Sequence, residues 1–312
     1  MEKLNELNKL FNSSNPDEIL KFYNNFKTAR ELITWSKNRP RGKAKIYTVK
    51  GDTDLIIVIP TTNRNGKLAK NCENNVFKGQ EIVFIESGLD PFFNYARNSN
   101  IGLRYALRYK PKWIVLSNDD VQKVDDIHKL KTELSILDNN KIKIVTAKDL
   151  TDKLYLGKPI FTNLAKLHYY IHVLRHKNLY PKPLKEYARI YKNYLNVLKK
   201  YSPNYKMVIN DIPRKKLFFK KIRSFNGSSF FFILSPYLIK AFKGNVFDEV
   251  FINGVEDHEL FLRTDIQNKA IVNFKIKQKR GGGQTLGKGV KRVWIELFGL
   301  IYLNELLKRT KK

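Results

Sequence analysis

Short apolar segments divide the first half of the chain. They span residues 55–59, 81–85, 113–116 and 142–146, and the first is almost wholly β-branched before it ends at Pro60. Apolar runs of this length are typical of strands that are buried on both faces, as in a parallel sheet. Between these segments, near 66–76, 93–109 and 125–138, apolar residues recur at helical spacing. This alternation predicts an α/β fold with a mixed, mostly parallel central sheet and flanking helices.

The remaining segments have other patterns. Residues 1–40 predict helices, because Asn15 can cap a helix that Pro16 opens, and apolar residues follow at helical spacing. The segment 151–222 is basic and rich in tyrosine, with helices expected near 160–176 and 183–200. Strands are expected at 228–234 and 270–277, and an amphipathic helix at 288–309. We therefore predict a helical N-terminal extension (1–50), a first sheet half (51–150), a basic helical insertion (151–222), a second sheet half (223–287) and a C-terminal helix with a basic tail (288–312).

The charge balance is extreme. The 312 residues include 59 Lys+Arg and 29 Asp+Glu, a net charge of +30. Such a surface attracts polyanions, which include nucleic acids, anionic lipid headgroups and sugar nucleotides. Compositional drift is the alternative, because Lys, Asn, Ile and Tyr are all abundant.

Cysteine usage and hydropathy suggest a compartment. Cys72 is the single cysteine, so no intrachain disulfide can form. The first residues lack the apolar core of a secretory signal, and no apolar run reaches the roughly 18 residues that a bilayer crossing needs. We expect a cytoplasmic protein that can lie peripherally on the inner face of the membrane.

Polar clusters follow three of the expected strands. Asp119 and Asp120 follow 113–116, Thr61 to Arg64 follow 55–59, and Glu86 follows 81–85. In α/β sheets, ligands bind beyond the carboxyl ends of the strands. Carboxylates there can hold a divalent cation against a diphosphate. The alternative is a solvent-exposed turn at the strand end, in which Asn-Asp-Asp is common. A second acidic pair, Glu256 and Asp257, is a candidate for proton transfer. The alternative is that these acids only stabilise the N-terminal end of a helix.

Four segments in order resemble family 2 glycosyltransferases of the GT-A fold. The first is Val58-Ile59-Pro60-Thr61-Thr62-Asn63-Arg64, and the second is Ala96-Arg97-Asn98 with Ile101-Gly102 and Ala106. The third is Leu116-Ser117-Asn118-Asp119-Asp120. The fourth is Phe247-Asp248-Glu249 followed by Gly254-Val255-Glu256-Asp257-His258-Glu259-Leu260 and Arg263. The resemblance covers about residues 55–265 and leaves out the first fifty residues and the basic insertion.

This resemblance implies a metal-dependent, inverting transfer of a sugar from a nucleotide-diphosphate sugar. Asp120 is the expected ligand of Mn²⁺ or Mg²⁺, with Asp119 on the metal or on sugar hydroxyls. Asp257 is the expected general base, and Glu256 shapes the site or is the rival base. Residues expected to contact the donor are Thr61, Thr62, Asn63, Arg64, Glu86, Arg97, Asn98 and Asp119. Gly227 and Ser228 are expected on the acceptor side.

The chain departs from the family pattern at two positions. Glu86 stands where the family usually has an Asp. Many members also have a metal-binding His after the last strand, whereas this chain reads Lys279-Arg280-Gly281-Gly282-Gly283-Gln284. Either Asp120 holds the ion together with water and the diphosphate, or the basic loop replaces part of its charge. This glycine-rich loop could also close over the diphosphate, or it could be an ordinary turn.

The acceptor and two rival functions stay open. A glycan, a lipid-linked molecule or a protein could receive the sugar, and the basic insertion suits an anionic membrane surface. Its tyrosines and lysines also suit nucleic acid, which we regard as the less favoured partner. The rivals are therefore a nucleic-acid-binding protein on a transferase-like scaffold and a nucleotidyltransferase that uses a similar acid pair. The histidines at 168, 172 and 176 are spaced for one helix face, where we expect half-buried residues rather than metal ligands.

Overall fold

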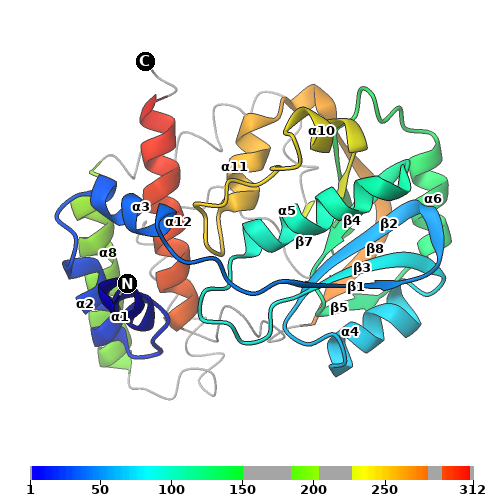
Figure 1. Cartoon of the computed structure of the whole chain (residues 1–312). Helices are drawn as coiled ribbons and strands as arrows, with labels where there is room; N and C mark the ends of the chain where they lie inside the picture. The colour runs from blue at the N-terminus through cyan, green and yellow to red at the C-terminus, as the bar shows by residue number, and fades with distance from the viewer. Residues whose placement is uncertain (1, 150–183, 204–226, 280–289, 310–312) are drawn as a thin grey trace.

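A curled, eight-stranded mixed sheet forms the centre of the larger part of the molecule (Figure 1). The structure is a computed structural model that describes residues 2–149, 184–203, 227–279 and 290–309. The strand order is β1-β3-β2-β4-β7-β6-β8-β5. The strands are β1 (Lys45–Val49), β2 (Asp52–Thr61), β3 (Gln80–Glu86), β4 (Trp113–Ser117), β5 (Val121–Lys123), β6 (Ile144–Asp149), β7 (Gly227–Leu234) and β8 (Lys269–Gln278).

The prediction of an α/β fold with a mixed sheet is confirmed, but the prediction that most strands are parallel is wrong. Within the described sheet, β2 pairs in parallel with β3 and β4, and β6 pairs in parallel with β8. The other four pairings, β1–β3, β4–β7, β6–β7 and β5–β8, are antiparallel. A continuous apolar run indicates burial on both faces, but it carries no information about strand direction. β1 also places the last residues of the predicted N-terminal extension in the sheet.

The two faces of the sheet bury alternate residues of each strand. Leu55, Ile57 and Ile59 of β2 pack on one side, and Ile56 and Val58 pack on the other. The first side is covered by α4 (Lys67–Asn71), the π-helical turn Cys72–Val76 and α6 (Ile127–Ser135). The second side is covered by α5 (Tyr95–Ala106), α10 (Pro236–Ala241) and α11 (Glu256–Arg263). Short 3-10 turns at Leu107–Tyr109 and Ile266–Asn268 complete these connections.

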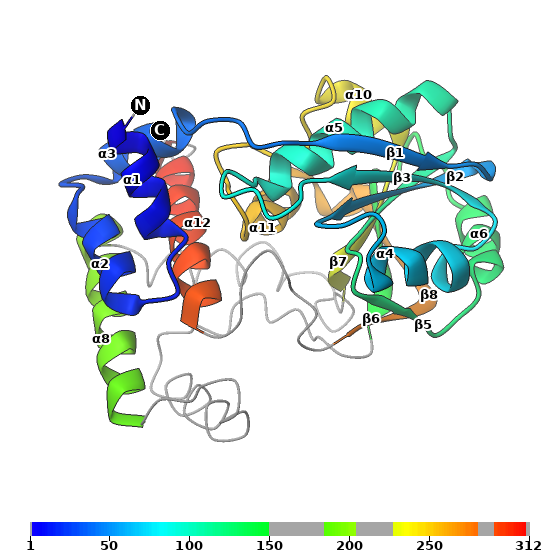
Figure 2. The same cartoon turned by 60° about the horizontal axis from the view of Figure 1, so that its bottom comes forward.

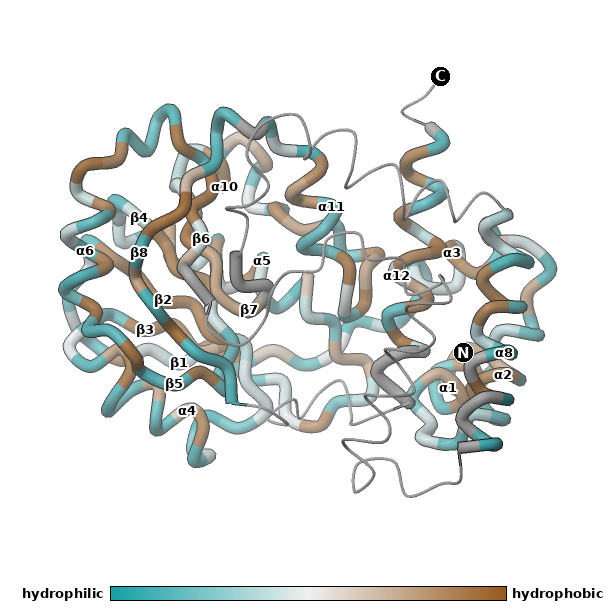
Figure 3. Tube along the Cα trace, turned by 180° about the vertical axis from the view of Figure 1, so that it is seen from behind, coloured by the Kyte–Doolittle hydropathy of each residue, from teal (hydrophilic) through white to brown (hydrophobic). Residues whose placement is uncertain are grey.

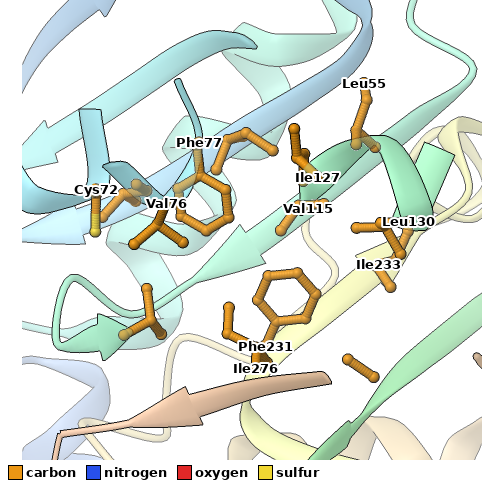
Figure 4. Packing of buried hydrophobic residues seen from close by; sticks show 14 of the residues in the cluster. Leu55, Cys72, Val76, Phe77, Val115, Ile127, Leu130, Phe231, Ile233 and Ile276 are labelled. Atoms are coloured by element: carbon orange, nitrogen blue, oxygen red, sulfur yellow. The ribbon is translucent and has the colours of Figure 1, made fainter. Parts of the chain in front are cut away.

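Aliphatic side chains and the Phe77 and Phe231 rings pack together on the first side of the sheet, as Figure 4 shows. The Phe77 and Phe231 rings stack with centroids 6.3 Å apart, and Phe231 also stacks with Phe274 at 5.8 Å. Cys72 is fully buried in the same cluster, as expected for a core residue. Burial raises the pKa of its thiol. The thiol is therefore protonated and serves packing.

A separate cluster of helices lies beside the sheet (Figures 1 and 2). It contains α1 (Glu2–Phe11), α2 (Pro16–Asn24), α3 (Ala29–Lys37), α8 (Leu184–Tyr201) and α12 (Val290–Arg309). One core joins these helices, with Trp35, Tyr194 and Trp294 at its centre. Segments from both ends of the chain and from the predicted insertion therefore bury one another. Figure 3 shows hydrophilic and hydrophobic residues alternating along these helices.

The sequence-based expectations for these helices have mixed outcomes. The cap is confirmed, because the Asn15 side chain accepts a hydrogen bond from the Asp17 amide at 2.9 Å and Pro16 opens α2. Trp294 and Phe298 are each only 1% exposed in the helical core. They therefore close a core and present no surface to a membrane. The helix expected at 160–176 and the loop at 280–283 lie outside the described residues.

None of the helices in the described part of the chain combines the length and the apolarity that a bilayer crossing requires.

Candidate functional site

The carboxyl ends of β2 and β4 carry the first half of the site. Thr61 at the end of β2 donates its hydroxyl to Oδ2 of Asp119 at 2.7 Å. Burial raises the pKa of Asp119 to about 6, and the negative charge of Asp120 adds to this, while the Thr61 hydrogen bond opposes it. The two strand ends therefore meet as predicted, and Asp119 changes protonation state near pH 6.

Asp120 lies deeper than Asp119 and is only 3% exposed. The side-chain amide of Gln278, the last residue of β8, donates to both of its carboxylate oxygens at 3.1 Å. The Asp120 backbone carbonyl accepts from the Lys279 amide at 2.7 Å. Gln278 was not predicted as a site residue. It immediately precedes the segment in which the family pattern places a histidine, and its position at the end of an expected strand is the feature that could have indicated it.

The second acidic pair lies at the start of α11, where the helix is preceded by strained backbone. Val255 has φ 75°, a conformation that costs a β-branched residue of order 1–3 kcal/mol, and Gly254 before it has φ 117°. The Glu256 carboxylate accepts the Gly254 amide at 2.5 Å and is buried. Asp257 is partly exposed. The strained turn therefore buries one carboxyl group and leaves the other accessible.

Burial raises the pKa of Glu256 to about 8, and the neighbouring Asp257 charge contributes next. Because its usual pKa is near 4.5, Glu256 is largely protonated at neutral pH in the folded protein. A protonated carboxyl group can donate a hydrogen bond but cannot accept a proton. This division favours Asp257 over Glu256 as the group that receives one.

Tyr95, the first residue of α5, links the two acidic pairs. Its hydroxyl donates to Oδ1 of Asn118 at 3.1 Å. Burial raises its pKa above the usual value, and the nearby carboxyl groups of Glu256, Asp257 and Asp120 raise it further. Asp120 and Asp257, which lie far apart in the sequence, therefore both raise the pKa of one hydroxyl. Tyr95 was not predicted, although it directly precedes the Ala96-Arg97-Asn98 segment at the expected edge of the sheet.

Two of the predicted donor-binding residues are engaged with each other. Oε2 of Glu86 accepts from the backbone amide of Arg64 at 2.7 Å. The Arg64 guanidinium forms a 2.8 Å ion pair with Glu73 and lies 4.2 Å from the centroid of the Phe84 ring. Glu86 therefore holds the turn after β2, while the Arg64 charge is already paired.

The other predicted donor residues divide by position. Thr62 is buried beside Thr61, and Oδ1 of Asn63 accepts from the Asn65 amide at 2.9 Å within the same turn. Asn98 is buried, and its side-chain nitrogen has no hydrogen-bond partner within the described residues. Arg97 instead donates to the Gly42 carbonyl at 2.6 Å. The structure thus gathers Thr61, Thr62, Asn63 and Glu86 at the strand ends and directs Arg97 elsewhere.

The predicted acceptor residues Gly227 and Ser228 open β7. Gly227 pairs with Lys148 of β6. β7 itself lies between β4 and β6.

The donor chemistry of the site suits a hard divalent cation. Asp119 and Asp120 supply carboxylate oxygens, a ligand type that Mg²⁺ and Mn²⁺ prefer, while the Gln278 side chain presents its amide nitrogen to Asp120 as a hydrogen-bond donor. Across the described residues, no group of three or more His, Cys, Asp or Glu side chains gathers to hold a metal. The residues therefore fit an ion that takes its remaining ligands from a diphosphate and water, as one of the sequence-based alternatives states.

Comparison of the chain with protein-family models, with curated proteins and with solved structures gives no match. The functional argument therefore depends on the residues and on the geometry of this site.

Proposed function

We propose that the protein is a metal-dependent glycosyltransferase that moves a sugar from a nucleotide-diphosphate sugar to an acceptor hydroxyl with inversion. The single observation that carries this proposal is that Tyr95 donates to Asn118, directly before the first acidic pair, while Glu256, Asp257 and Asp120 all raise its pKa. Sugar transfer needs a bound cation that offsets the negative charge of the leaving diphosphate. It also needs a group that accepts the proton of the attacking hydroxyl. Two acidic pairs near one buried hydroxyl would meet both needs.

Asp120 and Asp119 are the residues that would hold Mn²⁺ or Mg²⁺, with the Gln278 amide beside them. The ion would offset the negative charge that develops on the diphosphate when the glycosidic bond breaks. Asp119 is more exposed than Asp120, and the Thr61 hydroxyl holds its side chain in place. It can therefore orient sugar or ribose hydroxyls. With a pKa of about 6, Asp119 is mostly ionised at pH 7. Donor binding should therefore weaken below about pH 6.

Asp257 is the proposed base that receives the proton of the acceptor hydroxyl. It is partly exposed, whereas Glu256 is buried and largely protonated at neutral pH. Glu256 would then hold the turn before α11 through the Gly254 amide. An in-line displacement needs the base on the side of the sugar opposite the diphosphate. A base that comes from a different element than the metal ligands supports this arrangement.

We further propose that the acceptor is a glycan, a lipid-linked molecule or a protein. The net charge of +30 supports work at an anionic membrane surface on the cytoplasmic side. The nucleic-acid-binding and nucleotidyltransferase alternatives are retained as outcomes of the tests below.

A thermal-shift series with nucleoside diphosphates, with and without Mn²⁺, tests the proposed site. We expect one nucleotide to raise the melting temperature of the wild type mainly when Mn²⁺ is present. Asp120→Asn should abolish this Mn²⁺-dependent part. Asp265→Asn changes an exposed aspartate beyond α11 and is the matched control, which should respond as the wild type does. Equal responses of both variants would refute the metal assignment.

Turnover separates the base from the metal site. Asp257→Asn should lose transfer or hydrolysis of the nucleotide sugar while the Mn²⁺-dependent thermal shift persists. Retained turnover would remove Asp257 from the mechanism. Release of pyrophosphate from a nucleoside triphosphate, with the nucleoside monophosphate attached to a product, would favour the nucleotidyltransferase. Tight, salt-sensitive DNA or RNA binding that survives Asp120→Asn, without turnover, would favour the binding protein.

A further inference from the structure

A cavity of about 780 Å³ lies against α5, α11 and the segment that precedes α11. Four arginines line it, namely Arg41, Arg97, Arg104 and Arg263, together with three carboxylates. Its volume lies within the range of small-molecule sites, about 300–1,000 Å³. Arg97 follows Tyr95 by two positions, which corresponds to about 200° around a helix, so the two side chains leave α5 in opposite directions. The cavity is therefore distinct from the site around Tyr95.

Three of the four guanidinium groups form no salt bridge with any residue that the structure describes. Arg97 donates to the Gly42 carbonyl at 2.6 Å, and Arg104 donates to Oδ1 of Asn245 at 2.7 Å. Both acceptors are neutral. Arg41 is exposed at the rim, and among the described residues none of Arg41, Arg97 and Arg104 forms a salt bridge. Their positive charges are consequently available to a ligand.

The carboxylates of the cavity are engaged by the protein itself. Glu259 forms a two-point ion pair with Arg263, at 2.7 and 2.9 Å. Asp248 accepts from the Tyr302 hydroxyl at 2.6 Å and from the Val250 amide at 3.0 Å. The ion pair balances the charge of Glu259, whereas the hydrogen bonds hold the Asp248 carboxylate in place without balancing its charge.

Glu249 is the remaining carboxylate. It accepts a long 3.3 Å contact from the Asn100 amide. Partial burial lowers the pKa of Arg97, the Glu249 charge opposes this, and the positive charges of Arg41 and Arg104 lower it further. Arg41 and Arg104 thus repel Arg97 across the cavity, while Glu249 and Asp90 attract it.

We propose that this cavity binds a phosphate-bearing ligand, held by Arg41, Arg97 and Arg104. Guanidinium groups donate paired hydrogen bonds that match the oxygens of a phosphate, and three in one concavity match a phosphomonoester or a diphosphate. Such an anion would relieve the repulsion of Arg97 by Arg41 and Arg104. The phosphate can belong to a soluble metabolite or to a lipid headgroup, and the chemistry that recognises it is the same. The inference does not depend on the proposed sugar transfer.

Isothermal titration with pyrophosphate in the presence of EDTA tests this site, because the chelator removes any metal-dependent binding at Asp120. Arg41→Ala removes an exposed side chain without a salt bridge to the described residues, so the fold should persist. We expect it to weaken pyrophosphate binding by about tenfold or more, since a hydrogen bond to a charged group is worth about 1.5–3 kcal/mol. Arg108→Ala is the matched control, because Arg108 is exposed just after α5 and does not line the cavity. It should bind as the wild type does, and so should Asp120→Asn.

Equal losses for Arg41→Ala and Arg108→Ala would overturn the proposal, because the binding would then reflect only the general positive charge. Absence of binding to pyrophosphate and to vesicles alike would also overturn it. Flotation with vesicles of phosphatidylcholine and phosphatidic acid identifies the source of the phosphate. Arg41-dependent flotation together with Arg41-dependent pyrophosphate binding assigns a lipid phosphate. Arg41-dependent binding of pyrophosphate alone assigns a soluble ligand.

Discussion

Replacing Glu256 by glutamine should change how the stability of the protein depends on pH. In the folded state burial raises the pKa of Glu256 to about 8, against about 4.5 when the chain is unfolded. Between these values the folded protein holds a proton that the unfolded chain releases. Stability supplied by protonated Glu256 is therefore full below about pH 4.5 and is lost as the pH rises toward 8. Glutamine carries no titratable proton, so the stability of Glu256→Gln should not fall in this pH range for this reason.

The size of the effect follows from the pKa difference. Each pH unit over which the folded state holds one extra proton lowers the free energy of unfolding by about 1.4 kcal/mol. Between pH 5 and pH 8, allowing for partial titration at both limits, the loss is about 3 kcal/mol. Because Glu256 is buried, solvent screens it little. The stability of Glu256→Gln relative to wild type should therefore rise by about 3 kcal/mol over this range.

Urea unfolding at pH 5, 6, 7 and 8, followed by tryptophan fluorescence, measures the effect. Trp35, Trp113 and Trp294 are buried in the sheet core and in the helical core, so they report on both parts. Glu6→Gln on the exposed surface of α1 is the control, and its difference from wild type should not vary with pH. A Glu256→Gln difference that is flat, or that falls with rising pH, would refute the assignment of Glu256 as a protonated carboxyl group.

Three further substitutions test other contacts. Gly102→Ala would place Cβ 2.3 Å from Cγ1 of Val58, so urea unfolding should give a loss of about 2 kcal/mol, and an unchanged midpoint would contradict the α5–sheet packing. Thr61→Val removes the hydrogen bond that favours ionised Asp119, so its pKa should rise above about 6. The pH midpoint of Mn²⁺-dependent nucleotide binding would show this rise, and a downward shift would count against it. Tyr23→Phe removes a buried 2.6 Å bond to the Trp294 carbonyl and should cost about 1 kcal/mol, whereas no loss would argue against docking of α2 on α12.

The strands that the sequence predicted were those buried on both faces. The segments 55–59, 81–85 and 113–116 all lie inside β2, β3 and β4. The predictions missed β1 and β5, since β1 is largely exposed at the sheet edge and β5 has three residues. Neither has the continuous apolar run that reports burial on two faces. Short or exposed strands depend on their partners in the sheet, which local sequence does not specify.

The candidate site was predicted in part for a similar reason. Residues that directly follow a buried strand, such as Thr61 and Asp119, must lie at its carboxyl end, so adjacent strands bring them together. Tyr95 and Gln278 depend on the packing of α5 and on the pairing of β8, which local sequence does not reveal. Arg97 was expected at the donor, but its position two residues beyond Tyr95 turns it to the opposite side of the helix.

By itself the sequence determined the alternation of buried strands and helices, the cap at Asn15 and the placement of acidic residues at a strand end. These features follow from local periodicity and from hydrogen bonding between near neighbours. Only the tertiary structure decided the strand directions, the union of both chain ends with α8 in one core and the meeting of Asp120 with Gln278. Those depend on contacts between residues far apart in the chain, because the free energy of burial depends on the area covered and not on which distant segment covers it.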